Sequence, residues 1–145
     1  MITAEDAPRI LTKKLVAVIS DKLEAGTAMN ALAHMALGLG TLLGSDEALM
    51  CDYKDATGVS HPAISAYPFI ILKGRPSKIR EAIEISKLQD IRIVDFINTM
   101  TVGSYTEQLE RTKSTPHQDL EFYGAVFYGE TAAVSEITKK FSLFR

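Results

Sequence analysis

The sequence predicts an α/β fold, namely a three-layer α/β/α sandwich built on a mixed, mostly parallel sheet. Three short apolar runs, at 14–20, 69–72 and 91–97, are rich in β-branched residues and typical of strands that are buried on both faces. Helical patterns lie between these runs, and such connections are long enough for right-handed crossovers between parallel strands. The alternation of strands and helices therefore predicts helical layers on both faces of one sheet.

The first predicted strand is followed by a helix that packs on the sheet. The run KLVAVIS at 14–20 leads into a polar loop that ends at Gly26, and Thr27 is placed to cap the next helix. Apolar side chains recur over much of the circumference of this helix, so we expect it to lie close against the sheet. Three glycines between positions 38 and 44 weaken its last turns, because glycine is a poor helix former.

The next segment predicts a strand pair, a buried strand and a second helix. Residues 49–54 and 59–64 flank the segment 55–58, which contains the Asp and Gly of a tight turn. A buried strand at 69–72 stops before a Gly and a Pro. The helix that begins at Ser77 then carries an apolar stripe opposite charged side chains.

The last third of the chain predicts two more strands and two more helices. The strand at 91–97 carries Asp95, and a carboxylate in a buried strand is costly unless it is paired or lies at the edge of the sheet. Ser104 and Glu107 have the spacing of a capping box, which opens a short helix. A strand at 120–128 then precedes a C-terminal helix with apolar residues on one side.

Length and composition describe a single domain that spans residues 1–145. Hydrophobic residues make up 46% and charged residues 23% of the chain, and a core of this size needs no metal or disulfide. The formal net charge of −2 creates no overall field that attracts nucleic acid or an anionic membrane. A single cysteine, a mixed-polarity N-terminus and no run near the ~20 apolar residues of a membrane span predict a cytoplasmic protein with no membrane partner.

Common catalytic and cofactor motifs are absent from the sequence. It contains no G-x-S-x-G elbow, no G-x-G-x-x-G or Walker loop, and no C-x-x-C or H-E-x-x-H spacing. The glycine-rich stretch at 38–44 ends a predicted helix, whereas phosphate binds where a helix begins. We therefore expect no cofactor and no metal.

Asn30 and His34 are four residues apart and share one face of the first predicted helix. If that face meets the end of the sheet, the imidazole of His34 can act as a general base or hold a water against an electrophile. Asn30 can then bond the substrate. The alternative is a packing role, in which the imidazole bonds to a backbone carbonyl.

Asp95 and Thr99 stand near the end of the strand at 91–97. Ligands of open α/β sheets gather at the carboxyl ends of strands, so a carboxylate and a hydroxyl at this position are placed to contact a substrate. We name Asp95 as a catalytic candidate beside His34, and Thr99 as a substrate-binding candidate. The alternative is that Asp95 pairs with an arginine or caps the loop after the strand.

For three other groups of residues, a structural role is a simpler explanation than a catalytic or ligand-binding one. Asp52, Asp55 and His61 have spacings that could collect a metal, but turn formation accounts for Asp55 without one. The four basic residues within 73–80 are expected to form a solvated helix start and not a phosphate or RNA contact. Cys51 is expected to be a buried, inert thiol, because no cation lies beside it in the sequence.

The residues also carry a family resemblance. The strand at 14–19, the loop that ends at Gly26 and the helix MNALAHMA at 29–36 are similar to the opening of type II peptidyl-tRNA hydrolases. The stretch DFINT at 95–99 is similar to a later D-x-x-x-T motif of those enzymes, and the segment 120–129 to their closing strand. Over nearly its whole length, the chain more closely resembles a bacterial family of uncharacterised function that shares this fold and in which a segment like DATGVSHPAIS recurs.

The resemblance implies the type II peptidyl-tRNA hydrolase fold and a site near His34 and the end of the strand that holds Asp95. The sequence departs from the hydrolases in the loop before the helix. Thr27 stands where those enzymes carry a lysine important for catalysis, and Lys22 is the nearby cation that could replace it. Thr27 and Lys22 are therefore also substrate-binding candidates.

Three functions are compatible with these residues. The leading one is a hydrolase-like domain with lost or altered activity that binds a small polar ligand or hydrolyses an ester with an activated water. The second is hydrolysis of peptidyl-tRNA, with the basic residues around Arg75 as the RNA contact; the net charge and Thr27 disfavour it. The third is a non-enzymatic interaction module, in which apolar surfaces form the homodimer that we expect.

Overall fold

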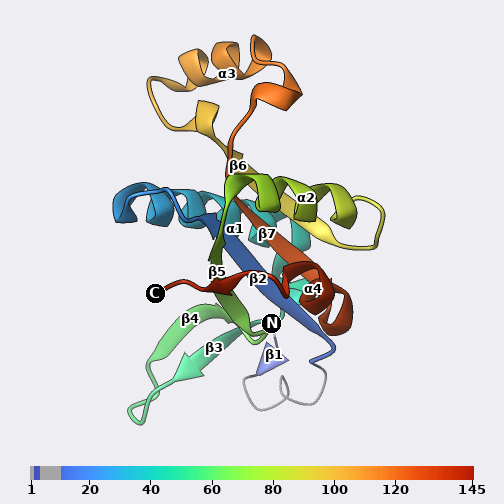
Figure 1. Ribbon diagram of the computed structural model, residues 1–145. Helices are drawn as coiled ribbons and strands as arrows, with labels where there is room; N and C mark the ends of the chain where they lie inside the picture. Colours follow the sequence, from blue (N-terminus) through green and yellow to red (C-terminus); the bar gives the residue numbers. More distant parts are fainter. Residues whose placement is uncertain (1, 4–10) are drawn as a thin grey trace.

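The computed structural model describes residues 2–3 and 11–145. They form a large sheet, the helices that cover it, and a small sheet (Figure 1). The strands are β1 (Ile2–Thr3), β2 (Lys13–Ser20), β3 (Met50–Lys54), β4 (Ser60–Ser65), β5 (Phe69–Gly74), β6 (Arg92–Ile97), β7 (Phe122–Glu130) and β8 (Ser142–Leu143). The helices are α1 (Ala25–Glu47), α2 (Pro76–Ser86), α3 (Tyr105–Lys113) and α4 (Thr131–Thr138), with short 3-10 turns at Asn98–Met100 and His117–Asp119.

The large sheet is mixed, as predicted, and has the strand order β6-β7-β2-β5-β8. The expectation of a mostly parallel sheet is wrong, because only β2 and β5 pair in parallel and the three other pairings are antiparallel. The cause is β7, which inserts between β6 and β2 and runs against both. The crossover from β5 through α2 to β6 therefore spans two strands and does not join neighbours.

Burial on both faces defines the two central strands. The side chains of β2 from Leu15 to Ile19 are at most 4% exposed, and those of β7 from Ala125 to Tyr128 at most 2%. Continuous burial of this kind requires a cover on each side of the sheet, since successive side chains point to opposite faces. The predicted three layers are confirmed: α1 covers one face, and α2 and α4 cover the other (Figure 1).

Alternate residues of β2 belong to two separate hydrophobic clusters. Ala17 and Ile19 pack with the α1 residues Ala31, Met35 and Leu39. On the other face, the next residues of the strand pack with α2 and α4, in a cluster that includes Val16, Val18, Ile79, Ile83 and Val134. The core is thus divided by the sheet into two halves.

Helix α1 differs from its prediction at both ends. It begins at Ala25, and its N-cap is Glu24, three residues before the expected cap, without a side-chain capping bond. Thr27 therefore lies inside the first turn and is not a cap. The helix continues past the first two glycines and breaks its regular geometry only at Gly44, with φ 72° and ψ 170°. This backbone conformation favours glycine, which has no Cβ.

The small sheet, in the order β1-β3-β4, lies at the opposite end of the molecule from α3 (Figure 1). The predicted turn between β3 and β4 is confirmed by the carboxylate of Asp55, which accepts hydrogen bonds from the Thr57 hydroxyl and from the N–H groups of Thr57 and Val59. These bonds, led by that from the Thr57 hydroxyl, lower the pKa of Asp55 to about 2. Within residues 2–3 and 11–145, no helix is both long and apolar enough to cross a membrane.

Two glycines provide a direct test of this packing. A Cβ added at Gly124 in β7 would lie 2.8 Å from Met35 Cε and 3.1 Å from the carbonyl oxygen of Val18. We expect Gly124→Ala to lower the free energy of unfolding by about 1–3 kcal/mol, because the core is already filled. The exposed Gly40 of α1 has no atom within 4 Å of such a Cβ, so Gly40→Ala should raise it by about 0.5–1 kcal/mol.

Urea unfolding followed by circular dichroism measures both changes. A Gly124→Ala protein as stable as the wild type would show that α1 does not pack closely on β7.

Candidate functional site

An open cleft of about 710 Å³ lies between α1, the strand β6 and the segment that carries α3. Among the described strands, β6 is an edge strand of the large sheet, so none of them pairs with one side of its backbone. The cleft is lined by Asn30, His34, Met35, Val94, Asp95, Phe96, Met100, Thr101, Tyr105, Gln108, Leu109 and Thr112. Three of the candidates named from the sequence are in this set: Asn30, His34 and Asp95.

Helix α1 brings Asn30 and His34 into the cleft together, as their spacing predicts. Both residues are exposed, and the helix buries Met35 beside them in the core. The His34 ring stacks on Phe96 of β6, with 6.0 Å between ring centroids and 29° between ring planes. In the part of the chain that the structure describes, His34 makes no hydrogen bond, so its ring nitrogens are not engaged by a backbone carbonyl.

Asp95 lines the cleft from the strand edge, but alternation along β6 points its side chain to the other face of the sheet. Val94 and Phe96 pack with the cluster under α1, whereas Ile93 and Ile97 pack with the cluster under α2 and α4. The cross-strand partner of Asp95 is Ala125, which also belongs to the second cluster. The carboxylate of Asp95 was expected to work beside His34, but the structure does not bring the two groups together.

The electrostatic surroundings of Asp95 agree with that placement. Burial raises the pKa of Asp95, and the positive charges that oppose this rise are Lys87, just after α2, and His117. Among residues 2–3 and 11–145, Asp95 forms neither an ion pair nor a side-chain hydrogen bond, so the expected alternative of an arginine partner is not observed either.

Thr99 does not line the cleft but holds one of its walls. It is 1% exposed, and its hydroxyl shares a 2.7 Å hydrogen bond with the hydroxyl of Thr112 in α3. Arg111 donates hydrogen bonds from its guanidinium to the carbonyl oxygens of Thr99, at 3.2 Å, and Val102, at 2.9 Å. These bonds position α3, which buries none of its own side chains.

Lys22 and Thr27 lie outside the set of residues that line the cleft. Lys22 is exposed in the turn after β2, where its backbone N–H donates to the Ser20 hydroxyl at 3.3 Å. Thr27 is half-buried in the first turn of α1. The proposed replacement of the missing family lysine by Lys22 therefore has no geometric support in this cleft.

Helix α3 supplies a wall that the sequence analysis did not identify. The capping box that opens it is confirmed, because Ser104 and Glu107 bond to each other's backbone N–H. Its cleft residues Tyr105, Gln108, Leu109 and Thr112 have the spacing i, i+3, i+4 and i+7. This spacing marks one face of a helix, so the signal was present in the sequence, although what the face covers depends on the tertiary structure.

Two members of the remaining candidate groups, Arg80 and Cys51, make structural hydrogen bonds. Arg80 donates to the carbonyl oxygens of His117, at 3.0 Å, and Leu120, at 2.6 Å. Cys51 is buried, as expected, and its thiol donates to the carbonyl oxygen of Ile64 at 3.2 Å. In the described residues, no group of three His, Cys, Asp or Glu side chains is arranged to hold a metal.

Together these features define an α/β/α domain with a ligand-sized cleft at the edge of its sheet. A family model described as a protein of unknown function (DUF2000) matches residues 13–145, and the chain belongs to that family. A solved structure of a protein of unknown function from Agrobacterium tumefaciens is similar, with a TM-score of 0.80 and 18% identity, covering 94% of this chain and 100% of the other. No curated protein matches. These matches do not test the resemblance to type II peptidyl-tRNA hydrolases, which stays a prediction.

The pH dependence of stability tests the placement of Asp95. The folded protein holds the proton of Asp95 more tightly than the unfolded chain, whose pKa is near 3.8. Ionisation of this carboxyl therefore costs stability as the pH rises through its raised folded-state pKa. We expect Asp95→Asn to be more stable than the wild type at pH 7, and this advantage to vanish at pH 3.

Urea unfolding at the two pH values measures this effect, with Asp90→Asn, at an exposed position, as the control. An Asp95→Asn protein that is less stable than the wild type at pH 7 would mean that the carboxylate has a favourable partner.

The anchoring of α3 can be tested without changing a residue that lines the cleft. Arg111→Met removes the two guanidinium bonds to the Thr99 and Val102 carbonyl oxygens. We expect amide hydrogen exchange to become about tenfold faster in Tyr105–Lys113 while exchange in β7 stays unchanged, because α3 has no buried side chains to hold it. Lys113→Met, at an exposed position on the same helix, is the matched control; equal exchange in both variants would show that Arg111 does not hold α3.

Proposed function

We propose that the cleft between α1, β6 and α3 binds a small ligand that has both polar groups and an apolar part. The observation that carries this proposal is the convergence of Asn30, His34 and Gln108 on one cleft with an apolar lining. Small-molecule sites commonly combine a mostly apolar surface with a few polar groups that fix the orientation of the ligand. The volume of about 710 Å³ is within the range of such sites.

The cleft offers two kinds of surface, which predict a ligand with an apolar part and a polar part. Met35, Phe96 and Leu109 offer apolar surface, and the side-chain amides and the imidazole offer donors and acceptors. The open edge of β6 adds backbone N–H and C=O groups, because the outward-facing groups of an edge strand have no ladder partner. A compact molecule with an amide or ester group next to an apolar substituent satisfies both parts.

Ester hydrolysis at this cleft is a second function, and the exposed His34 ring stacked on Phe96 favours it. The imidazole would take a proton from water, the resulting hydroxide would add to the ester carbonyl, and the collapse of the adduct would release the alcohol, which receives the proton. The side-chain amides of Asn30 and Gln108 can donate to the developing oxyanion. The Asp95 carboxylate has no part in this step, since it lies on the other face of the sheet.

Peptidyl-tRNA and a second copy of the chain rank behind the small ligand as partners. Among the described residues, those that line the cleft include no lysine or arginine with which RNA phosphates could form an ion pair. A tRNA substrate would require salt-dependent binding and cleavage of peptidyl-tRNA at low salt. The homodimer likewise stays a prediction, and light scattering at high protein concentration tests it.

Binding of N-acetylphenylalaninamide, which carries amide groups and an apolar ring, tests the main proposal. We expect His34→Ala and Asn30→Ala each to weaken its binding by roughly threefold to tenfold, the loss that corresponds to one hydrogen bond. Isothermal titration calorimetry measures the affinities. His117→Ala and Gln89→Ala are matched controls, because they remove the same chemical groups outside the cleft.

Equal weakening by the control variants, or no binding of the amide to the wild type, would contradict the proposal. The ethyl ester of the same amino acid tests hydrolysis, for which His34→Gln should abolish turnover and Asp95→Asn should leave it unchanged.

A further inference from the structure

A second pocket, separate from the cleft, lies at the carboxyl ends of the parallel strands β2 and β5. It has a volume of about 270 Å³ and brings together the turn after β2, the junction of β5 with α2, and the segment after α4. Its lining consists of Asp21, Lys73, Gly74, Arg75, Lys78, Lys140, Phe141 and Ser142. The fold therefore collects cations from both 73–78 and position 140, which are far apart in the sequence.

The charges in this pocket are unbalanced. Among the described residues that line it, four cationic side chains face one carboxylate, that of Asp21, although the whole chain has a formal net charge of −2. Lys78 is paired with Glu81 at 3.0 Å. Within the described part of the chain, Lys73, Arg75 and Lys140 have no ion-pair partner. Their mutual repulsion is relieved when an anion binds between them.

Phe141 forms a fixed apolar wall of the same pocket. A Cβ added at Gly74 would lie 2.3 Å from Cδ1 and 2.6 Å from Cε1 of the Phe141 ring, so only glycine permits the ring to lie this close to β5. Ser142, the next residue, pairs with Lys73 in the sheet and holds this segment in place. The lack of a Cβ at Gly74 thus leaves room for the ring beside β5.

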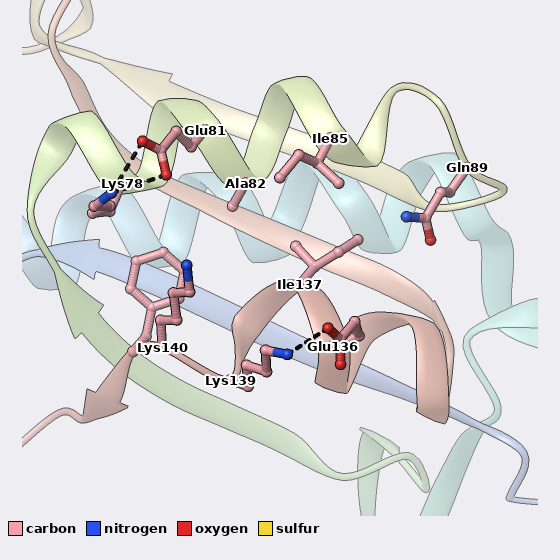
Figure 2. A pocket seen from close by; sticks show the side chains of 10 residues that line it. Lys78, Glu81, Ala82, Ile85, Gln89, Glu136, Ile137, Lys139 and Lys140 are labelled. Atoms are coloured by element: carbon pink, nitrogen blue, oxygen red, sulfur yellow. Dashed lines mark hydrogen bonds and ion pairs between the residues drawn. The ribbon is translucent and has the colours of Figure 1, made fainter.

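A groove of about 260 Å³ continues from the pocket between α2 and α4 and shares Lys78, Lys140 and Phe141 with it. Its lining combines apolar side chains with two carboxylates, those of Glu81 and Glu136, each of which is paired with a lysine. Figure 2 shows Ile85 of α2 and Ile137 of α4 pointing into the space between the helices, with Lys78 and Lys140 at one end. The Ile85 side chain is 50% exposed there. An exposed apolar surface that adjoins a cluster of cations matches a ligand with an anionic head and an apolar body.

We propose that this pocket and groove together bind a small phosphate monoester whose organic part is apolar. The phosphate lies among Lys73, Arg75 and Lys140, where a dianion offsets the excess of positive charge. The organic part extends along Phe141 between Ile85 and Ile137. This site is on the α2 and α4 face of the sheet, so it is independent of the cleft beside His34.

Calorimetric titration at pH 8 and low salt with inorganic phosphate, methyl phosphate and phenyl phosphate tests the proposal. We expect phenyl phosphate to bind about tenfold more tightly than methyl phosphate, because only its ring gains contact with the groove. The double variant Lys73→Gln/Arg75→Gln should weaken the binding of all three anions by at least about tenfold. Ile85→Ser should remove the preference for phenyl phosphate and leave methyl phosphate unaffected.

Lys54→Gln/Lys113→Gln is the control, since it changes the net charge equally at exposed positions outside both pockets. Circular dichroism confirms that each variant is folded. Equal loss in the control, absence of binding by phenyl phosphate, or equal affinity for methyl and phenyl phosphate would each overturn the proposal. Tighter binding of an oligoribonucleotide without a terminal phosphate would also overturn it and assign the cations to RNA.

Discussion

Burial of the β2 and β7 strands on both faces is the constraint on which the rest of the structure depends. Because side chains from Leu15 to Ile19 alternate between two apolar clusters, helices must cover both sides of the sheet. A polar functional side chain in the middle of these strands would be buried without a hydrogen-bond partner, which is costly. Exposed functional groups are therefore confined to the edges: His34 beside β6 at one edge, and the cations around Lys73 near the other.

The sequence predicted those features of the fold that local signals determine. Apolar β-branched runs marked the buried strands, the pair Ser104 and Glu107 marked the start of α3, and Asp55 marked the turn of the small sheet. Strand direction was not predictable in the same way. The antiparallel insertion of β7 between β6 and β2 depends on pairing between residues far apart in the chain, such as Val94 with Val126, and no local pattern encodes that choice.

Only the part of the candidate site that depends on local spacing was predicted correctly. Asn30 and His34 share a helical face whatever the tertiary structure, so their spacing placed them together correctly. Asp95 was expected beside them, but the period of two along β6 sends it to the opposite face, with Ile93 and Ile97. The face that α1 covers had to be known before this could be deduced.

The central feature of the cleft is that the sheet separates His34 from the Asp95 carboxylate. Proton–proton nuclear Overhauser measurements on the labelled protein test this separation directly. We expect contacts from the His34 ring to the Phe96 ring, and contacts from the Asp95 Cβ protons to the Ala125 methyl group, its cross-strand partner. Contacts between the Asp95 Cβ protons and the His34 ring would contradict the account and restore the two residues as catalytic partners.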